Sequence, residues 1–549
     1  MRKPEKYTIC HLVGRSVEEF SGRIALGYVG EEGISYRSMG ERITEVSGML
    51  ESMNIQKGDR VALLGENSPN WGIAYLSVLC RAAVVVPILP DFHEDEILTI
   101  LEHSETSLVF VSEKQYTRIG KSLEKKKIPW VMIEKLEPEV KKSESTLPQA
   151  GCFTCNDNLV GEDDLAALIY TSGTTGSSKG VMLTHKNISW LVNQSLSIQD
   201  VNENDRFLSI LPMSHTLENS LGFLLPLHTG ASVYYIRKQP VAPSVMLDAF
   251  QKIRPTILLT VPMIIEKIYR KQVLPKFNKS PLSRSLFKFK PTRILLNRLA
   301  GKKLLKVFGG ELRFFGIGGA KLDGQIERYL REAGFPYAIG YGLTETAPLL
   351  AGSPPEKTVY QSTGYSLDGV SLKLININEE TGEGEIVAMG PNVMLGYYKN
   401  EEITKSVFTE DGYFRTGDLG YIDRKGVIYI RGRIKNVIVG TNGENIYPEE
   451  IESLINGLDA VEESLVIQMQ GRIVAMVNIN LHELEDRFLR LNEKVLEITH
   501  ETMDDVLAEI QKFVNQRVNK FSRLHQVILQ PVPFEKTPTR KIKRYLYGG

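Results

Sequence analysis

The residues with the clearest potential for chemistry form one loop, which runs from Tyr170 to Thr184 with the sequence Tyr-Thr-Ser-Gly-Thr-Thr-Gly-Ser-Ser-Lys-Gly-Val-Met-Leu-Thr. The loop contains one cation, Lys179, and no acidic residue. Its glycines let backbone N–H groups approach a ligand closely, and its hydroxyl groups and lysine add further donors. This set of donors suits a chain of phosphate groups.

The residues on either side of this loop decide between a binding site and a flexible linker, since Gly, Ser and Thr are typical of both. Residues Leu165 to Ile169 are apolar and uncharged, which predicts a buried strand of a parallel sheet. Apolar residues also follow at once, from Val181 to Leu183. The spacing is not that of a Walker-A loop, because Lys179 follows a serine and Gly180 stands where Ser or Thr would hold the metal.

The pattern Tyr-Thr-Ser-Gly-Thr-Thr-Gly-x-x-Lys-Gly resembles the phosphate loop of the adenylate-forming superfamily, which includes acyl-CoA synthetases, peptide-synthetase adenylation domains and luciferases. The resemblance implies that the loop binds ATP through Thr171, Ser172, Gly173, Thr174, Thr175, Gly176 and Lys179. Five further stretches resemble motifs of this superfamily in the same order along the chain. The first, Leu211 to Glu218, resembles a wall of the acyl pocket and includes His215, a candidate catalytic-site residue.

Two further stretches that contain glycine, both before residue 400, belong to the predicted ATP site. Gly318, Gly319 and Ala320 resemble the segment that lies against adenine and the acyl chain, where small residues permit close approach. The stretch Ile339–Thr346 reads Ile-Gly-Tyr-Gly-Leu-Thr-Glu-Thr. By resemblance, Tyr341 stacks on adenine beside Gly342, Thr344 contacts the α-phosphate and Glu345 binds the Mg²⁺ that bridges phosphates. One carboxylate plus phosphate oxygens is a usual Mg²⁺ site.

Polar residues nearer the C-terminus resemble the ribose site, the hinge and the catalytic lysine of the superfamily. A fixed carboxylate can accept protons from both hydroxyls of a ribose, and Asp418 takes this role by resemblance, with Arg433 nearby. Lys435 falls at the position of the interdomain hinge, and the loop around Gly443 resembles the wall of the CoA tunnel. The terminal stretch Pro533–Lys543 places the adenylation lysine at Lys541, although Arg540 replaces the more frequent glycine.

The elements predicted around these motifs give an α/β fold. Residues 1 to about 165 alternate helices and strands, with a capping box at Ser38 and Glu41, a helix that opens at Ser68-Pro69 and a strand over Val84–Leu89. From about residue 434 the pattern becomes a small α+β module. We therefore expect a large adenylation domain with parallel sheets over 1–433 and a small mobile domain over 434–549.

One stretch stands apart by its charge. Between positions 267 and 306 there are thirteen Lys or Arg side chains and no acidic residue, with Leu, Ile and Phe interleaved. A basic amphipathic stretch is attracted to anionic lipid surfaces. A solvated helical face is the simpler alternative, and RNA binding lacks any module signature. This basic stretch also resembles an insertion that long-chain acyl-CoA synthetases carry at this place in the chain.

The bulk composition narrows the class of protein. The 66 basic and 66 acidic residues balance, which argues against a nucleic-acid-binding protein. The N-terminus is charged and lacks the apolar core of a secretory signal, and no uncharged run reaches the length of about 18 residues that a membrane span needs. Four cysteines are too few for a disulfide framework in a chain of this length. These features predict a cytoplasmic protein, at most peripheral to a membrane.

Together the motifs predict an acid–thiol ligase, an ATP-dependent acyl-CoA synthetase for medium- to long-chain fatty acids with ATP, Mg²⁺ and coenzyme A. The acceptor could instead be an acyl-carrier protein, or the enzyme could stop at acyl-AMP; relatives that stop there carry an insertion, and none is visible between Glu345 and Asp418. A non-catalytic nucleotide-binding protein is the alternative from another class, and it would lack Glu345 or Lys541.

Overall fold

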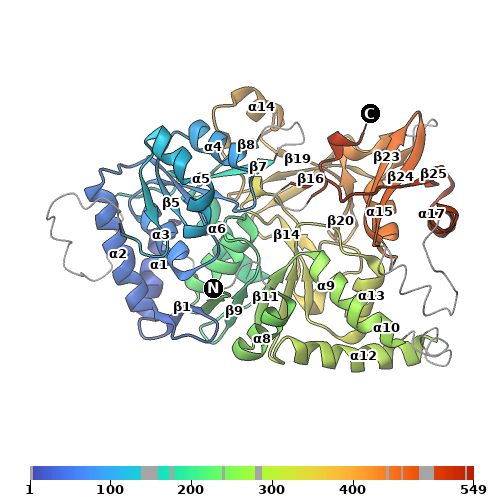
Figure 1. Ribbon diagram of the computed structural model, residues 1–549, viewed down its shortest axis with the longest axis horizontal. Coiled ribbons are helices and arrows are strands. Elements are labelled where there is room, and N and C mark those ends of the chain that lie inside the picture. Colours follow the sequence, from blue (N-terminus) through green and yellow to red (C-terminus); the bar gives the residue numbers. More distant parts are fainter. Residues whose placement is uncertain are drawn as a thin grey trace.

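The computed structural model describes residues 4–137, 159–172, 178–237, 242–277, 287, 289–439, 444–458, 461–480, 500–537 and 541–548. The chain folds as an α/β protein with two large sheets at one end and a small β-sheet domain at the other (Figure 1). The predicted fold class is thereby confirmed. Of the residues expected in the site, Gly173, Thr174, Thr175, Gly176 and Gly443 lie outside the described residues, as does Arg540.

The first large sheet has seven strands in the order β13-β12-β11-β9-β10-β1-β2. All of its pairs are parallel except the pair of β2 with β1. The strands are β1 (Ile24–Tyr28), β2 (Ile34–Ser35), β9 (Arg206–Ser209), β10 (Ser232–Tyr235), β11 (Ile257–Thr260), β12 (Phe314–Ile317) and β13 (Tyr337–Ile339).

The second large sheet also has seven strands, in the order β18-β8-β7-β4-β3-β5-β6. They are β3 (Arg60–Leu64), β4 (Val84–Ile88), β5 (Thr106–Val111), β6 (Trp130–Met132), β7 (Leu165–Ser172), β8 (Ser178–Thr184) and β18 (Gly396–Tyr397). The strand expected before the phosphate loop is β7, which pairs parallel with β4 as predicted and antiparallel with β8 on its other side. The loop therefore connects two neighbouring antiparallel strands, which fixes both of its ends.

Helices pack on these sheets, and the largest core joins residues of both sheets to α1, α2, α3 and α6. Ser68 and Pro69 open α3 as predicted, but the expected capping box at Ser38 is wrong, because α2 begins at Tyr36 with Ser35 as its cap. The helices before residue 410 are α1 (Ile9–Glu19), α2 (Tyr36–Ser52), α3 (Pro69–Cys80), α4 (Glu94–His103), α5 (Glu113–Lys126), α6 (His185–Gln194), α7 (Leu225–His228), α8 (Pro243–Ile253), α9 (Pro262–Ile268), α10 (Leu274–Phe277), α12 (Lys290–Val307), α13 (Gly324–Ala333) and α14 (Glu401–Ser406). None of the helices described here is long and apolar enough to cross a bilayer.

A third sheet carries functional candidates between the two large sheets and the C-terminal end. Its order is β16-β17-β19-β20, all antiparallel, with bounds β16 (Ser371–Ile375), β17 (Gly384–Met389), β19 (Phe414–Ile422) and β20 (Ile428–Arg433). Two short pairs lie beside it, β14 (Ala351–Gly352) with β15 (Tyr365–Ser366) and β21 (Ile438–Val439) with β22 (Asn445–Ile446).

The C-terminal elements have a hydrophobic core of their own, formed by residues between 438 and 527. The three strands β23 (Val461–Met469), β24 (Arg472–Ile479) and β25 (Gln526–Leu529) form one sheet, and α15 (Pro448–Asn456) and α17 (His500–Asn515) complete the group. Pro448 opens α15 as expected. A short turn of 3₁₀ helix, Ile434–Asn436, connects β20 to this module.

Candidate functional site

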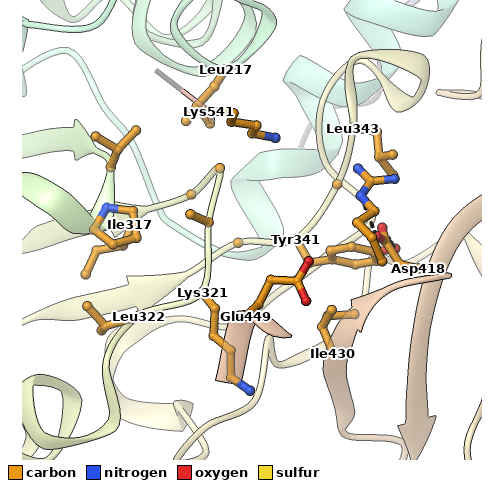
Figure 2. A pocket seen from close by; sticks show the side chains of 18 of the residues that line it. Leu217, Ile317, Lys321, Leu322, Tyr341, Leu343, Asp418, Ile430, Glu449 and Lys541 are labelled. Carbon is orange, nitrogen blue, oxygen red and sulfur yellow. Dashed lines mark hydrogen bonds and ion pairs between the residues drawn. The ribbon is translucent and has the colours of Figure 1, made fainter. Parts of the chain in front are cut away.

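The candidate site is one large cleft, of about 3440 Å³, at which the large sheets, the third sheet and the C-terminal module meet. Loops after β12 and β13 supply its floor, β19 and β20 supply one wall, and the C-terminal segment supplies Lys541. In Figure 2 the amine of Lys541 extends toward the side of the cleft on which Tyr341 and Asp418 lie. Residues from all six predicted motifs thus line one space.

Asp418 is the centre of a buried polar group on this wall. The antiparallel register of β19 and β20 places it opposite Arg433, whose Nε lies 2.9 Å from Asp418 Oδ1. The hydroxyl of Tyr341 donates to Oδ2 at 2.8 Å, and Arg433 also donates to the Thr416 carbonyl at 2.9 Å. Burial raises the pKa of Asp418, while the Arg433 charge and the Tyr341 hydroxyl oppose that rise. The carboxylate is therefore fixed in place by two donors from different elements.

Glu345, the predicted metal ligand, accepts a hydrogen bond from the Tyr397 hydroxyl at 2.9 Å. Tyr397 belongs to β18, the strand that pairs with β8, and its ring lies under the ammonium of Lys179, 5.2 Å from the ring centroid. Burial lowers the pKa of Lys179, as does the nearby charge of Lys435, while Glu345 raises it. Tyr397 thus connects the phosphate-loop cation to the predicted metal site, a role that no sequence motif indicated.

Lys541 lines the cleft, and its backbone is hydrogen-bonded to Thr537 of the C-terminal segment. Its backbone N–H donates to the Thr537 hydroxyl at 3.2 Å, and its carbonyl accepts from the Thr537 N–H at 2.7 Å. Removal from water inside the cleft lowers the pKa of Lys541, Arg433 lowers it further, and Asp418 and Glu345 raise it. The sequence-predicted lysine and both predicted carboxylates are therefore close enough to interact electrostatically.

Two ion pairs hold this C-terminal segment on its own module. Lys536 pairs with Glu463, and Arg544 pairs with Glu452. The Glu452 side chain is nearly buried, and this burial raises its pKa to about 7 against the opposing effect of Arg544. No sequence motif indicated these acidic partners.

The described part of the phosphate loop consists of its two ends. Thr171 and Lys179 are register partners across β7 and β8, and so are Ser172 and Ser178. Thr171 and Lys179 line the cleft. The pairing of β7 with β8 therefore holds the two ends of the phosphate loop, at Thr171 and Lys179, next to each other.

The backbone conformation and close packing after β12 and β13 explain why glycine occupies specific positions there. Gly319 has a φ of +86°, and Gly318, Gly319 and Ala320 all line the cleft. A Cβ on Gly342 would lie 1.9 Å from the Pro348 carbonyl oxygen, so no other residue fits there. Thr344, which opens the 3₁₀ turn Thr344–Thr346, lines the cleft beside it.

His215 lines the same cleft. Burial lowers the pKa of its imidazole to about 4, and the Lys541 charge adds to that effect, so the ring is neutral at pH 7. Its Nδ1 accepts from the Leu217 N–H at 3.3 Å. The cleft is also lined by aliphatic and aromatic side chains of one hydrophobic cluster, which we call its apolar arm: Ile198, Phe207, Leu211, Leu221, Leu225, Ile257, Leu259 and Phe314.

A set of contacts across the cleft joins the small module to the rest of the chain, and no motif predicted it. Glu450, on α15, lies 3.1 Å from the Lys321 ammonium and 3.4 Å from Arg431. Arg431 also pairs with Glu383 at 2.8 Å, and Glu383 accepts a hydrogen bond from the Tyr447 hydroxyl. These contacts hold the module in the position that brings Lys541 into the cleft. The predicted hinge, Lys435, lies in the 3₁₀ turn beside them.

Comparison with known proteins gives a consistent picture. The chain is 27% identical over 572 residues to long chain acyl-CoA synthetase 4 of Arabidopsis thaliana, covering 93% of this chain and 84% of the relative. It is 25% identical to a long-chain-fatty-acid–[acyl-carrier-protein] ligase of the same plant, covering 99% and 85%. The solved structure of ATP-bound MatB from Rhodopseudomonas palustris matches with a TM-score of 0.75 and 25% identity, covering 98% of each chain.

The fold and the site together define an adenylate-forming, acyl-activating enzyme. Residues 13–398 match the family model described as AMP-binding enzyme, which is well over half of the chain. The chain belongs to the AMP-binding enzyme family.

Proposed function

We propose that this protein is an acid–thiol ligase, an ATP-dependent acyl-CoA synthetase that activates medium- to long-chain fatty acids. The observation that carries the proposal is one cleft lined both by polar groups, among them Lys541, Asp418 and Glu345, and by the apolar side chains of the arm. A carboxylate substrate with an alkyl chain fits this combination, because its head meets the cation while its tail is removed from water. The two long-chain relatives act on substrates of the same class by their names.

ATP would be held by groups that are already fixed. Asp418 would accept protons from the ribose hydroxyls, with Arg433 beside it, and Tyr341 would stack on adenine near Gly318–Ala320. Thr171, Ser172, Lys179 and the loop between them would bind the β- and γ-phosphates, with Thr344 at the α-phosphate. Because Asp418 and Tyr341 are mutually hydrogen-bonded at 2.8 Å, their positions require little rearrangement on binding.

A magnesium ion would lie at Glu345. No group of three or more His, Cys, Asp or Glu side chains within the described ranges could hold a metal ion by itself. A single carboxylate fits Mg²⁺, which is bound by one or two carboxylates together with substrate phosphates and water. The ion would neutralise charge on the phosphates, and Tyr397 would orient the Glu345 carboxylate toward it.

In the first half-reaction a carboxylate oxygen of the fatty acid attacks the α-phosphorus of ATP. A new phosphorus–oxygen bond forms, the bond to the bridging oxygen of the β-phosphate breaks, and pyrophosphate leaves. Lys541 would contact both the carboxylate and the α-phosphate, which offsets the repulsion between two anions. His215, neutral at pH 7, would serve as pocket wall rather than as a base.

In the second half-reaction the small module, residues 434–549, would turn about Lys435 against the large domain, residues 1–433. This motion withdraws Lys541 and breaks the contacts of Glu450, so that the loop around Gly443 can shape a CoA tunnel. The CoA thiolate sulfur then attacks the acyl carbon, the carbon–oxygen bond to AMP breaks and AMP leaves. One chain thus forms two sites in succession.

An acyl-carrier protein is the alternative acceptor, and one relative that covers 99% of this chain carries that acceptor in its name. Both acceptors present the same phosphopantetheine thiol, so the cleft serves either. The decisive experiment is a mass-spectrometric assay with ATP, Mg²⁺, CoA and a pooled ladder of fatty acids. Acyl-CoA products at medium and long chain lengths are the expected result. Acyl-AMP without acyl-CoA would overturn the acceptor, and the absence of both would overturn the function.

A further inference from the structure

The outward face of α12, Lys290–Val307, exposes apolar side chains that a folded protein normally buries. Leu295 is 60% exposed, Leu299 is 52% exposed, and Phe289, the residue before the helix, is 64% exposed. Leu295 and Leu299 are one helical turn apart and therefore lie on the same face. The helix runs along the lower edge of the molecule in Figure 1, outside the sheets.

The same face carries unpaired cations. Arg298, Lys302, Lys303 and Lys306 are all exposed, and within the described residues none of these side chains has an acidic partner. Arg293, on the opposite side of the helix, differs, because it pairs with Glu332 at 2.7 Å. The sequence holds no acidic residue between Glu266 and Glu311 that could neutralise the outward face.

The inward face of α12 packs against the rest of the protein. Asn297, Gly301 and Leu304 are buried against α13 and the second core. A Cβ on Gly301 would lie 2.8 Å from both the Cβ and the carbonyl oxygen of Ala333, so the two helices are in close contact. Leu295 and Leu299 do not belong to this core and remain more than half exposed, and their exposure needs a different reason.

We propose that the outward face of α12, formed by Phe289, Leu295, Leu299, Arg298, Lys302, Lys303 and Lys306, docks on an anionic lipid surface. Cations alone would fit any polyanion, but leucines among them gain free energy only where an apolar layer lies beneath the charged groups. The exposed leucines thus favour a lipid surface over a nucleic acid or an acidic protein.

The position of this face relative to the cleft supports the same partner. Arg270, Leu274 and Pro275 line the large cleft, and Leu274 and Leu305 of α12 pack against the same core. Leu274 of the cleft lining and α12 thus share one hydrophobic core, and we expect docking through α12 to turn this part of the cleft toward the lipid. If the proposed function holds, a fatty acid could pass from the membrane into the apolar arm without crossing water.

The test is co-sedimentation of the full chain with vesicles of phosphatidylcholine alone and of phosphatidylcholine with phosphatidylglycerol, without any substrate. We expect binding to the anionic vesicles only. The variant Arg298→Glu/Lys302→Glu/Lys303→Glu should bind at least about 100-fold more weakly, from about fivefold for each cation. The variant Leu295→Gln/Leu299→Gln should lose about tenfold while every charge remains.

The matched control is Lys121→Glu/Lys125→Glu/Lys127→Glu, which changes the net charge equally at exposed positions on α5 and directly after it, a region distant from α12 in Figure 1. This control should bind as the unmodified protein does. Equal losses in both charge variants, or no binding of the unmodified chain to anionic vesicles, would overturn the proposal. If the leucine variant binds anionic vesicles as well as the unmodified protein does, and if the protein also binds RNA, the partner of this face would be a polyanion instead.

A second arm, which rests on the proposed function, separates the two proposals. The charge variant of α12 should use fatty acid held in anionic vesicles about tenfold more slowly, and fatty acid dispersed in detergent at an unchanged rate. Failure of the ligase assay would leave the vesicle-binding result standing, while equal rates in both presentations would overturn the delivery role of α12.

Discussion

Lys541→Ala is the substitution that separates the two proposed half-reactions. The ammonium of Lys541 interacts with both Asp418 and Glu345 in the cleft, where it would meet the carboxylate and the α-phosphate. In the proposed second half-reaction the small module would turn and withdraw Lys541. We therefore expect acyl-AMP formation to collapse while the transfer of supplied acyl-AMP to CoA continues.

The magnitude follows from the environment of the lysine. Lys541 lines the cleft, and the charges of Arg433, Asp418 and Glu345 all act on its ammonium. Loss of one donor aimed at charge that develops in the transition state lowers kcat by about 10²–10³, or about 3–4 kcal/mol. The transfer step should change by less than about threefold, because in the proposed mechanism this lysine would not contact the transition state of transfer.

The assay measures acyl-AMP formation from ATP and fatty acid, and acyl-CoA formation from synthetic acyl-AMP, with the same preparations. Lys512→Ala is the matched control, since Lys512 is an exposed lysine of α17 in the same module and does not line the cleft. Equal losses in the two half-reactions of Lys541→Ala would refute the reasoning, as would a loss of adenylation in the control.

Four further substitutions test other parts of the site and the core. Asp418→Asn removes the charge that holds Arg433 at 2.9 Å, so we expect ATP binding measured by calorimetry to weaken by about 10- to 100-fold, and unchanged affinity would contradict the ribose role. Tyr397→Phe removes the donor to Glu345, so the Mg²⁺ concentration for half-maximal adenylation should rise about fivefold, with no effect on transfer from acyl-AMP. Glu450→Gln weakens two partly exposed ion pairs of about 0.2–1 kcal/mol each, so adenylation should slow about two- to fivefold while transfer does not, and equal slowing would exclude a role in positioning the module. Glu218 is buried and its pKa is raised to about 8, so it binds a proton more tightly in the folded state. Its contribution to stability, up to about 5 kcal/mol, should be present below pH 4.5 and be lost as the pH rises toward 8. Glu218→Gln should therefore show a smaller fall in thermal midpoint over this range, and parallel curves for both proteins would contradict it.

The chemistry of the motifs and the class of fold could be predicted from the sequence because both depend on residue types and spacings within short stretches of the chain. The alternation of helix and strand patterns gave the α/β fold, and Ser68-Pro69 and Pro448 opened helices where predicted. The cap of α2 was misplaced by three residues, because Ser35 and Ser38 are both good caps and only the pairing of β2 decides between them. Strand β7 was predicted as part of a parallel sheet, and its antiparallel partner β8 was not foreseen.

The sequence by itself determined which side chains can handle phosphate, ribose, metal and carboxylate, since those properties belong to residue types and short spacings. Only the tertiary structure decided which of them meet. Glu345 and Tyr397 are 52 positions apart, Asp418 and Tyr341 are 77 apart, and Lys321 and Glu450 are 129 apart, and no local pattern specifies such pairs. Strand register and the docking of the small module bring them within hydrogen-bond distance. The outward face of α12 is also a tertiary result, because the spacing of its leucines does not reveal which side of the helix the core covers.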